Sequence, residues 1–386
     1  MIAAARRHFV LVVWALSCGF YLAVGALGHA FLEHADVVVS NREPPGVLNY
    51  WAHWDGAYFT YIAEHGYRSA EATAFFPFYP LLIRAVGVAG AGPALAGVVI
   101  SVAATLAALF FFHGLTAHLR DERVARVATV ALAFFPTAFF LVADYSEALF
   151  LALSAGCLWA LYVRGDFLAA GAFGYFAAVS RSVGVALVIP LAWEWLRRRH
   201  GLRWESLLGV AAPVIGLATY SFYLWRVARQ PLLFNTVYEK SWGRKLHDPV
   251  STLHQGWSHG DDGLAYLVHW DRVFGTSSLN PPFLLSNTVN LVCAAVLLGL
   301  LVVGIFTLPR GLALYSIPIA LAPVSLPAPG LPLVSLPRYL LAALPLFIVL
   351  GSLLARSRFV LAIWLALSLA LGMLLTFEFV TWRWVA

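Results

Sequence analysis

The segment YWAHWDGAYFTYIAEHGY, residues 50–67, concentrates aromatic, acidic and imidazole side chains. Aromatic rings pack against the C–H faces of sugars and a carboxylate accepts hydrogen bonds from sugar hydroxyls, so the mixture is suited to carbohydrate binding. The side chains that could take part are Trp51, His53, Trp54, Asp55, Tyr58, Glu64, His65 and Tyr67. A structural interpretation fits equally well: Asp55 would N-cap a helix over residues 56–66, and the rings would anchor that helix at the lipid headgroups.

Two arginines that interrupt apolar stretches are the second candidate group. Arg181 lies within residues 167–196, and Arg338 lies in a proline-punctuated segment. A charge is expensive there, and a guanidinium binds phosphate oxygens bidentately, so both arginines could hold a phosphate. Alternatively, either side chain could extend to the headgroups or pair with Asp144 or Glu147.

Two further polar groups could complete a site. Tyr145 and Glu147 could reach a sugar or the arginines, although a helix-capping role for Asp144 or Ser146 competes with this interpretation. The polar stretch 228–280 could supply an acceptor surface from Asn235, Tyr238, Lys240, Trp242 and Arg244.

No metal site is expected. Four histidines of the second polar stretch show no HxxxH or HxH spacing, and the cysteines show no CxxC pair. These residues are His247, His254, His259, His269, Cys18, Cys157 and Cys293.

The composition requires a membrane around these groups. Of the 386 residues, 61% are hydrophobic and 11% charged, with a mean hydropathy of +0.80. Such a chain cannot form a soluble surface, and apolar runs long enough to cross the hydrocarbon recur along it. The arginines form short clusters and no continuous basic face, which excludes nucleic acid as the expected partner.

Lys and Arg in short loops are expected on the cytoplasmic side. With Arg6 and Arg7 inside, the basic loops at residues 120–126, 197–203 and 356–358 also fall inside, and about eleven crossings result. Residues 31–74 and 228–282 become the outer loops. Residues 75–88, which hold Pro77 and Pro80, are predicted to form an interfacial helix, and the prolines of residues 311–337 predict a kinked, partly non-helical segment that lines a cavity. The predicted crossings include residues 92–119, 127–143, 147–163, two short helices within 167–196 that meet near Arg181, 206–225, 283–307, 311–329, 336–355 and 358–378.

Five motifs occur in an order that resembles the PIG-V-type mannosyltransferases, and their bacterial members in particular, which are membrane enzymes of the GT-C class. They are WDGAYFTYIAEHGY with FFPFYPLL, FPTAFFLVADYSEALF, SRSVGVAL, WEWLRRR and SLPRYLLAALPLF. The resemblance covers most of the chain. It implies an all-α, polytopic GT-C fold in one domain, residues 1–386, with a helical first outer loop that carries the catalytic acid.

Asp55 is the position that matches this acid. It would act as a general base, taking the proton of an acceptor hydroxyl as that oxygen attacks the anomeric carbon. A lipid phosphate is already a good leaving group, so the second carboxylate of a glycosidase is not needed, and displacement in one step inverts the anomeric centre. Substrate contacts are predicted for Trp51, His53, Trp54, Tyr58, Glu64, His65, Tyr145, Glu147, Arg181, Lys240, Arg244 and Arg338.

The resemblance implies a polyprenyl-phosphate-mannose donor, a lipid-linked or cell-envelope glycan acceptor and no cofactor. We expect a monomer among membrane lipids, in the cell membrane, with a cytoplasmic N-terminus and an extracytoplasmic active site. The alternative function is a transporter or flippase of lipid-linked sugars, since polar groups at broken helices also describe substrate pathways. The gathering of carboxylates in the outer loops favours the enzyme.

Overall fold

The computed structural model describes residues 2–36, 46–88, 90, 92–201, 203–260, 263–264 and 282–385, and of these the side chains of residues 2–5 and 282–285 are not described. Within these ranges the chain is helical and contains no β-strand, only isolated bridge residues. The predicted all-α class is confirmed. His269 and parts of both predicted outer loops lie outside the described residues, and the single-domain organisation stays a prediction.

Among the described residues, six helices are long and apolar enough to cross a membrane. They are α1 (Ile2–Phe31), α4 (Pro93–Leu119), α6 (Glu147–Trp159, continued by a π-helical turn to Arg164), α9 (Ser206–Ala228), α13 (Pro282–Thr307) and α17 (Arg358–Val380). Shorter apolar helices are α3 (Phe78–Gly87), α7 (Phe167–Ser180), α14 (Arg310–Val324) and α16 (Leu344–Leu354). The chain is a multi-pass membrane protein, and its exact number of crossings stays a prediction.

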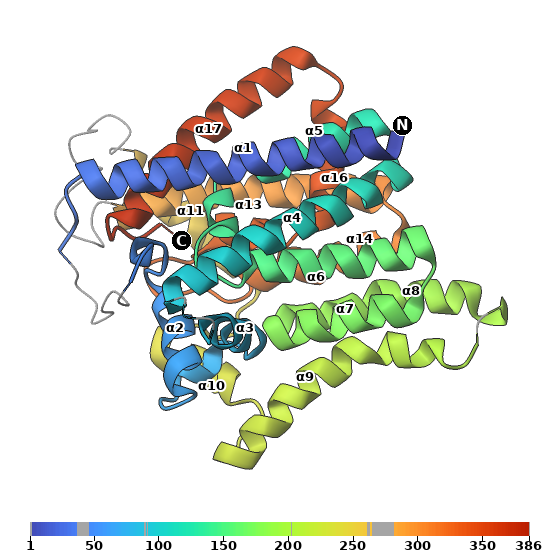
Figure 1. Cartoon of the computed structure of the whole chain (residues 1–386), viewed down its shortest axis with the longest axis horizontal. Helices are drawn as coiled ribbons and strands as arrows, with labels where there is room; N and C mark the ends of the chain where they lie inside the picture. Colours follow the sequence, from blue (N-terminus) through green and yellow to red (C-terminus); the bar gives the residue numbers. More distant parts are fainter. Residues whose placement is uncertain are drawn as a thin grey trace.

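The remaining helices connect this bundle. They are α2 (Asp55–His65), α5 (Glu122–Ala133), α8 (Val188–Arg198), α10 (Leu233–Trp242), α11 (Pro249–Gly260) and the single turn α15 (Leu336–Leu340), with 3-10 turns at Asn49–Trp51, Glu71–Ala74, Ala138–Leu141, Ser182–Leu187 and Arg199–Gly201. Figure 1 shows α4, α6, α7 and α9 side by side in that order, and α1 packs on α4 and α17.

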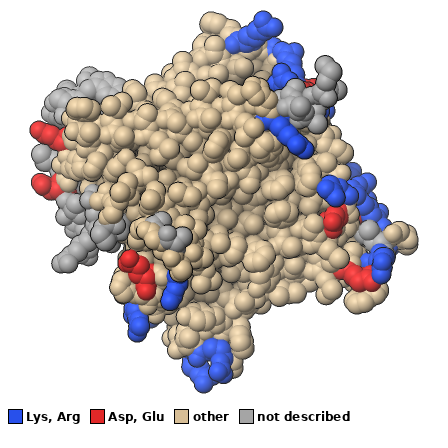
Figure 2. All heavy atoms as spheres, viewed as in Figure 1, with Lys and Arg blue, Asp and Glu red and all other residues tan. Residues whose placement is uncertain are grey.

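The predicted basic loops meet at one end of the bundle. Arg6 Nε lies 2.7 Å from a carboxylate oxygen of Glu122, and Arg120 donates to the carbonyl of Thr307 at 2.5 Å. We call this end of the bundle the basic end. It comprises the start of α1, the last residues of α8 and of the π-helical turn, and the turns that join α4 to α5, α13 to α14 and α16 to α17. Figure 2 shows Lys and Arg side chains along this edge. The predicted alternation of the chain is therefore consistent with the structure, and the side of the membrane stays a prediction.

Two predicted helices differ from the structure because of prolines. The expected crossing at residues 127–143 is α5, which begins at Glu122, where the Asp121 side chain accepts from Val124 N at 2.8 Å, and ends at Ala133. Pro136 has no amide hydrogen to continue that helix. Residues 336–355 divide into α15 and α16, with the break just before Pro345.

Other predicted elements are confirmed. The helix in residues 167–196 is interrupted at Arg181, between α7 and α8, and the proline-rich segment is non-helical from Ser325 to the start of α15. The helix α3 has only 10 residues, and Figure 1 shows it end-on, crosswise to α1 and α4. Its position at the membrane interface stays a prediction.

Candidate active site

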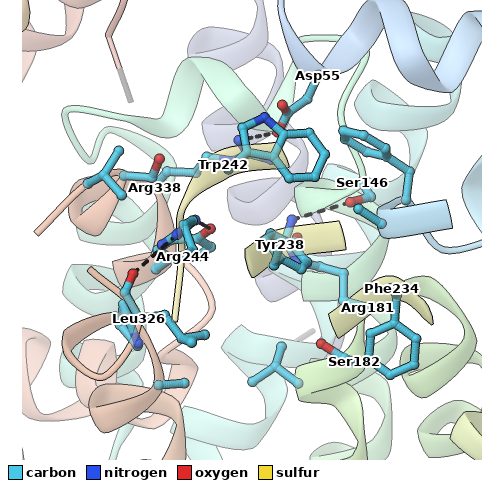
Figure 3. A pocket seen from close by; sticks show the side chains of 18 of the residues that line it. Asp55, Ser146, Arg181, Ser182, Phe234, Tyr238, Trp242, Arg244, Leu326 and Arg338 are labelled. Carbon is cyan, nitrogen blue, oxygen red and sulfur yellow. Dashed lines mark hydrogen bonds and ion pairs between the residues drawn. The ribbon is translucent and has the colours of Figure 1, made fainter. Parts of the chain in front are cut away.

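A pocket of about 600 Å³ opens where α2 begins and α7 and α14 end. Since α14 begins at the basic end, the pocket lies at the opposite end of the bundle. Its polar and aromatic lining is contributed by Trp54, Asp55, Tyr58, Phe59, Phe75, Phe76, Ser146, Ser180, Arg181, Ser182, Phe234, Asn235, Tyr238, Ser241, Trp242, Arg244, Ser335, Arg338, Tyr339 and Trp384. Figure 3 shows side chains entering it from segments far apart in the sequence.

Asp55 is the first residue of α2, and Arg338 of α15 binds its carboxylate. Arg338 Nη1 lies 2.5 Å from Asp55 Oδ2 (Figure 3). The Asp55 side chain is 29% exposed and that of Arg338 only 8%. The interpretation of Asp55 as an N-cap is wrong, because Trp54 occupies the cap position and no side chain caps the helix. Asp55 is a carboxylate that a molecule in the pocket can reach.

Glu147 connects Arg338 to Arg181. Its Oε1 atom accepts a hydrogen bond from Arg338 Nε and another from Arg181 Nη1 at 2.5 Å, and Arg181 Nη1 also lies 3.2 Å from the Ser146 hydroxyl. The Glu147 side chain is 5% exposed, so its charge is compensated inside the protein and not offered to the pocket. We call Asp55, Arg338, Glu147 and Arg181 the charge network.

Arg244 brings a third guanidinium into the pocket from beyond α10. Its Nε donates to the carbonyl of Leu326 at 3.1 Å and its Nη1 to the Tyr339 hydroxyl at 3.0 Å. Arg244 forms no ion pair among the described residues, and it is half-buried. Its positive charge is therefore available to an anion.

Tyr339 reports the electrostatic character of this part of the pocket. Burial alone would raise its pKa, but the neighbouring Arg244, Arg338 and Arg181 outweigh burial and hold the pKa of the phenol below its usual value. The guanidinium carbons of Arg181 and Arg244 lie 5.9 and 5.7 Å from the centre of its ring. A positive potential that favours the anionic form of a phenol also favours a bound anion.

Backbone strain flanks the charge network on both sides. Trp54, just before Asp55, has φ 57°, and Ser335, three residues before Arg338, has φ 62°. Left-handed conformations at residues other than glycine cost about 1–3 kcal/mol each and concentrate at functional sites. The fold therefore maintains two unfavourable conformations next to the helices that carry Asp55 and Arg338.

The predicted site residues divide into three groups. The pocket is lined by Trp54, Asp55, Tyr58, Arg181, Arg244 and Arg338. Tyr145 and Glu147 lie directly behind it; the Arg338 guanidinium carbon sits 4.7 Å from the centre of the Tyr145 ring. The third group does not line the pocket: Trp51, His53, Glu64, His65 and Lys240.

The positions of this third group have simple physical causes. Trp51 and His53 are fully buried, and the His53 ring stacks on Trp382 with centroids 3.7 Å apart. Glu64 and His65 are exposed at the far end of α2, about 14 Å along the helix from Asp55. Lys240 is exposed as well.

Sequence reasoning missed several lining residues. Tyr339 follows Arg338, and Ser180 and Ser182 flank Arg181, so proximity to the selected arginines could have indicated them. Trp384 had no such signal. No group of three or more metal-binding side chains occurs in the described part of the chain.

Fold and site together define a multi-pass, all-α membrane protein with an arginine-lined polar pocket at one end of its bundle. Residues 26–200 match the model of the family described as Mannosyltransferase (PIG-V), in agreement with the resemblance seen in the motifs.

Curated relatives agree with this family. GPI alpha-1,6-mannosyltransferase 2 of Homo sapiens is 31% identical over 200 residues, which are 45% of this chain and 40% of that protein. GPI mannosyltransferase 2 of Drosophila melanogaster is 33% identical over 109 residues, 25% of this chain and 24% of that protein. The match thus spans less than half the length of these relatives.

Two solved structures of other proteins are similar to this chain over most of its length. ArnT from Cupriavidus metallidurans bound to undecaprenyl phosphate is 14% identical with a TM-score of 0.48, over 98% of this chain and 76% of that chain. The second is the Archaeoglobus fulgidus oligosaccharyltransferase AglB in complex with an inhibitory peptide and a dolichol-phosphate. It is 12% identical with a TM-score of 0.43, over 97% of this chain and 56% of that chain.

Proposed function

We propose that this chain transfers mannose, with inversion, from a polyprenyl-phosphate-mannose donor to a hydroxyl group of a lipid-linked or cell-envelope glycan. The observation that carries the proposal is the partly exposed carboxylate of Asp55 in a pocket that also holds three guanidinium groups and several aromatic rings. A base, a phosphate-binding surface and sugar-binding rings are the parts that this reaction needs.

Asp55 takes the proton of the acceptor hydroxyl. As the acceptor oxygen forms its bond to the anomeric carbon, the bond from that carbon to the phosphate oxygen breaks, and lipid phosphate leaves with the electron pair. Glu147 is the only other carboxylate of the charge network, and its burial excludes it from contact with the acceptor. A nearby carboxylate also stabilises the positive charge that develops on the sugar.

Arg244 and Arg181 form the phosphate-binding surface. Arg244 has no carboxylate partner among the described residues, whereas Arg338 already donates to Asp55 through Nη1 and to Glu147 through Nε. We therefore assign Arg338 to the positioning of Asp55, and the leaving phosphate to Arg244 with Arg181, whose Nη1 contacts Glu147 and Ser146.

The remaining lining suits the other parts of the substrates. Trp54, Tyr58 and Trp242 offer rings to the sugars. Apolar side chains such as Val183 and Ile319 extend the pocket wall and would contact the first units of the polyprenyl chain. No cofactor enters the proposed reaction, and the protein acts as a monomer in the cell membrane, with the pocket on the extracytoplasmic face.

The test is donor consumption. Membranes that contain the full chain are incubated with radiolabelled polyprenyl-phosphate-mannose, and the labelled product is identified. We expect label in a glycan or glycolipid. Asp55→Asn should label it far more slowly, and Glu64→Gln, which changes a carboxylate of the same helix outside the pocket, should transfer normally. An intact donor in the presence of the wild-type chain would refute the proposal.

Transport or flipping of lipid-linked sugars is not favoured, because the matched family and the named relatives are transferases. Movement of the labelled donor across vesicle membranes without its consumption would reverse this preference.

A further inference from the structure

A second cavity, of about 400 Å³, lies at the basic end, far from the charge network. It is formed where the end of α4, the π-helical turn after α6, the last turn of α8 and the first turn of α14 meet. Its lining includes Tyr162, Trp193, Glu194, Arg197, Arg198 and Arg310. The proposed transfer reaction uses none of these residues.

The charge of this cavity is strongly positive. Glu194 is buried at 3% exposure, and its Oε2 atom binds Nε and Nη2 of both Arg197 and Arg198 at 2.7–3.1 Å. One carboxylate therefore fixes two guanidinium groups in place, and each keeps N–H donors that Glu194 does not engage. Arg310 adds a third positive charge and forms no ion pair within the described ranges.

Tyr162 provides an independent sign of a missing ligand. Its side chain is nine-tenths buried, and its hydroxyl has no hydrogen-bond partner among the described residues. The hydroxyl faces the first turn of α14, since a Cβ atom placed on Gly311 would lie 2.5 Å from it. A buried hydroxyl without a partner is unfavourable, and an oxygen of a bound anion would satisfy it.

The start of α14 completes the site. The first amides of a helix have no partners within that helix and carry a partial positive charge, which suits an anion. Here the Pro309–Arg310 turn that begins α14 lines the same cavity as the three guanidiniums.

We infer that this cavity binds a phosphate ester, held by Arg310, Arg197 and Arg198 with a hydrogen bond from Tyr162. Its position suits a lipid headgroup, because three of its walls are ends of apolar helices, namely α4, α6 with its π-helical turn, and α14. Such helix ends lie where the hydrocarbon meets the headgroups. The ligand chemistry could be supplied by an anionic phospholipid or by a soluble phosphate ester, and the experiment separates the two.

The probes are phosphatidylglycerol, phosphatidylcholine and soluble glycerol phosphate, added to the purified full chain in neutral detergent. Binding is measured by native mass spectrometry and by the shift in melting temperature. We expect phosphatidylglycerol to bind more tightly than phosphatidylcholine, and Arg310→Gln and Tyr162→Phe each to weaken it about tenfold, the size of one charge-assisted hydrogen bond.

Arg358→Gln is the matched control, because it removes the same charge from the same end outside the cavity and should leave the affinity unchanged. If glycerol phosphate binds and Arg310→Gln and Tyr162→Phe weaken its affinity in the same way, the site is supported and its ligand is a soluble phosphate ester. Equal affinity of all variants for every probe would overturn the inference. The melting temperature of each variant without lipid reveals misfolding, in which case Arg310→Lys replaces Arg310→Gln as the milder change.

Discussion

Arg338 Nη1 donates a hydrogen bond to Asp55 Oδ2 over 2.5 Å, which ties α15 to the first turn of α2. The same guanidinium binds Glu147, and Glu147 also binds Arg181. Two carboxylates and two guanidinium groups thus alternate in this network, although Asp55 and Arg338 are 283 positions apart in the sequence. Such an arrangement orients the Asp55 carboxylate before any substrate enters, which is the kind of preorganisation on which electrostatic catalysis depends.

Arg338→Met tests this arrangement. It leaves Glu147 with one cation instead of two and Asp55 without its partner, and breaking a buried ion pair costs about 3–5 kcal/mol. We expect the loss to lie near the lower value, because Arg181 still pairs with Glu147, and it should appear as a lower melting temperature. The double variant Arg338→Met with Glu147→Gln should lose less stability than the sum of the single changes. Additive losses would show that the two residues are not coupled.

Asp55→Asn is expected to lower the rate of transfer by about 10²–10⁴-fold, the usual contribution of a general base. The amide keeps an oxygen that can accept from Arg338, so the melting temperature should change little. Single-turnover kinetics with saturating donor measure the chemical step directly. The Glu64→Gln control should match the wild type, and a comparable rate for Asp55→Asn would exclude Asp55 as the base.

Arg244→Gln should weaken donor binding. It removes the guanidinium assigned to the leaving phosphate, so the KM for the lipid-phosphate donor should rise about tenfold or more. Lys240→Gln is its control, since Lys240 lies only four residues earlier, at the end of α10, and outside the pocket. A change confined to the acceptor KM would move Arg244 to the acceptor side of the site.

Asp144→Asn should alter the pH dependence of stability. Asp144 is fully buried in the turn before α6, and burial raises the pKa of its carboxyl well above the usual value. The folded protein then keeps a proton that the unfolded chain releases above about pH 4, so stability falls as pH rises from there towards the raised pKa. The asparagine variant lacks this loss. Melting temperatures between pH 4 and 8 should diverge in its favour, and parallel curves would contradict the burial of a neutral acid.

Gly97→Ala examines the same acid from the helix that covers it. A Cβ atom at position 97 of α4 would lie 2.0 Å from Asp144 Oδ1, so the acid or the helix must move. Overpacking of this kind costs about 1–3 kcal/mol. Gly87→Ala, which meets no neighbouring atom within 4 Å, is the control, and equal melting temperatures of the two variants would show that α4 does not press on Asp144.

Much of the fold could be predicted from the sequence, because a run of apolar residues as long as that of α4 or α17 has few alternatives in lipid. The prediction of a helix was wrong where hydropathy favours a membrane crossing but the backbone cannot continue its helical hydrogen bonds. Residues 127–143 are apolar enough to cross, but Pro136 ends the helical hydrogen bonding, and hydropathy alone does not register a missing amide donor.

The sequence allowed the charged residues of the site to be predicted, but not the ion pairs that join them. Asp55, Arg181 and Arg338 are conspicuous because charges are rare in this chain, and all three line the pocket. That Glu147 joins the two arginines depends on how α6, α7 and α15 pack, which the sequence does not state. Trp51 and His53 stand near Asp55 in the sequence, yet both are buried in the core. They precede α2, and their rings pack against Phe379 and Trp382, partners from the other end of the chain that the local sequence does not indicate.

The proline-rich wall between α14 and α15 gives the pocket a divided architecture. Its residues, such as Leu326 and Leu331, line the pocket from a segment without regular helical hydrogen bonds, while Asp55 and Glu147 belong to packed helices. Substitutions in the wall can therefore reshape the room for an incoming molecule and leave the reactive groups where they are. Acceptor specificity can therefore change through this one segment while the reaction itself stays the same.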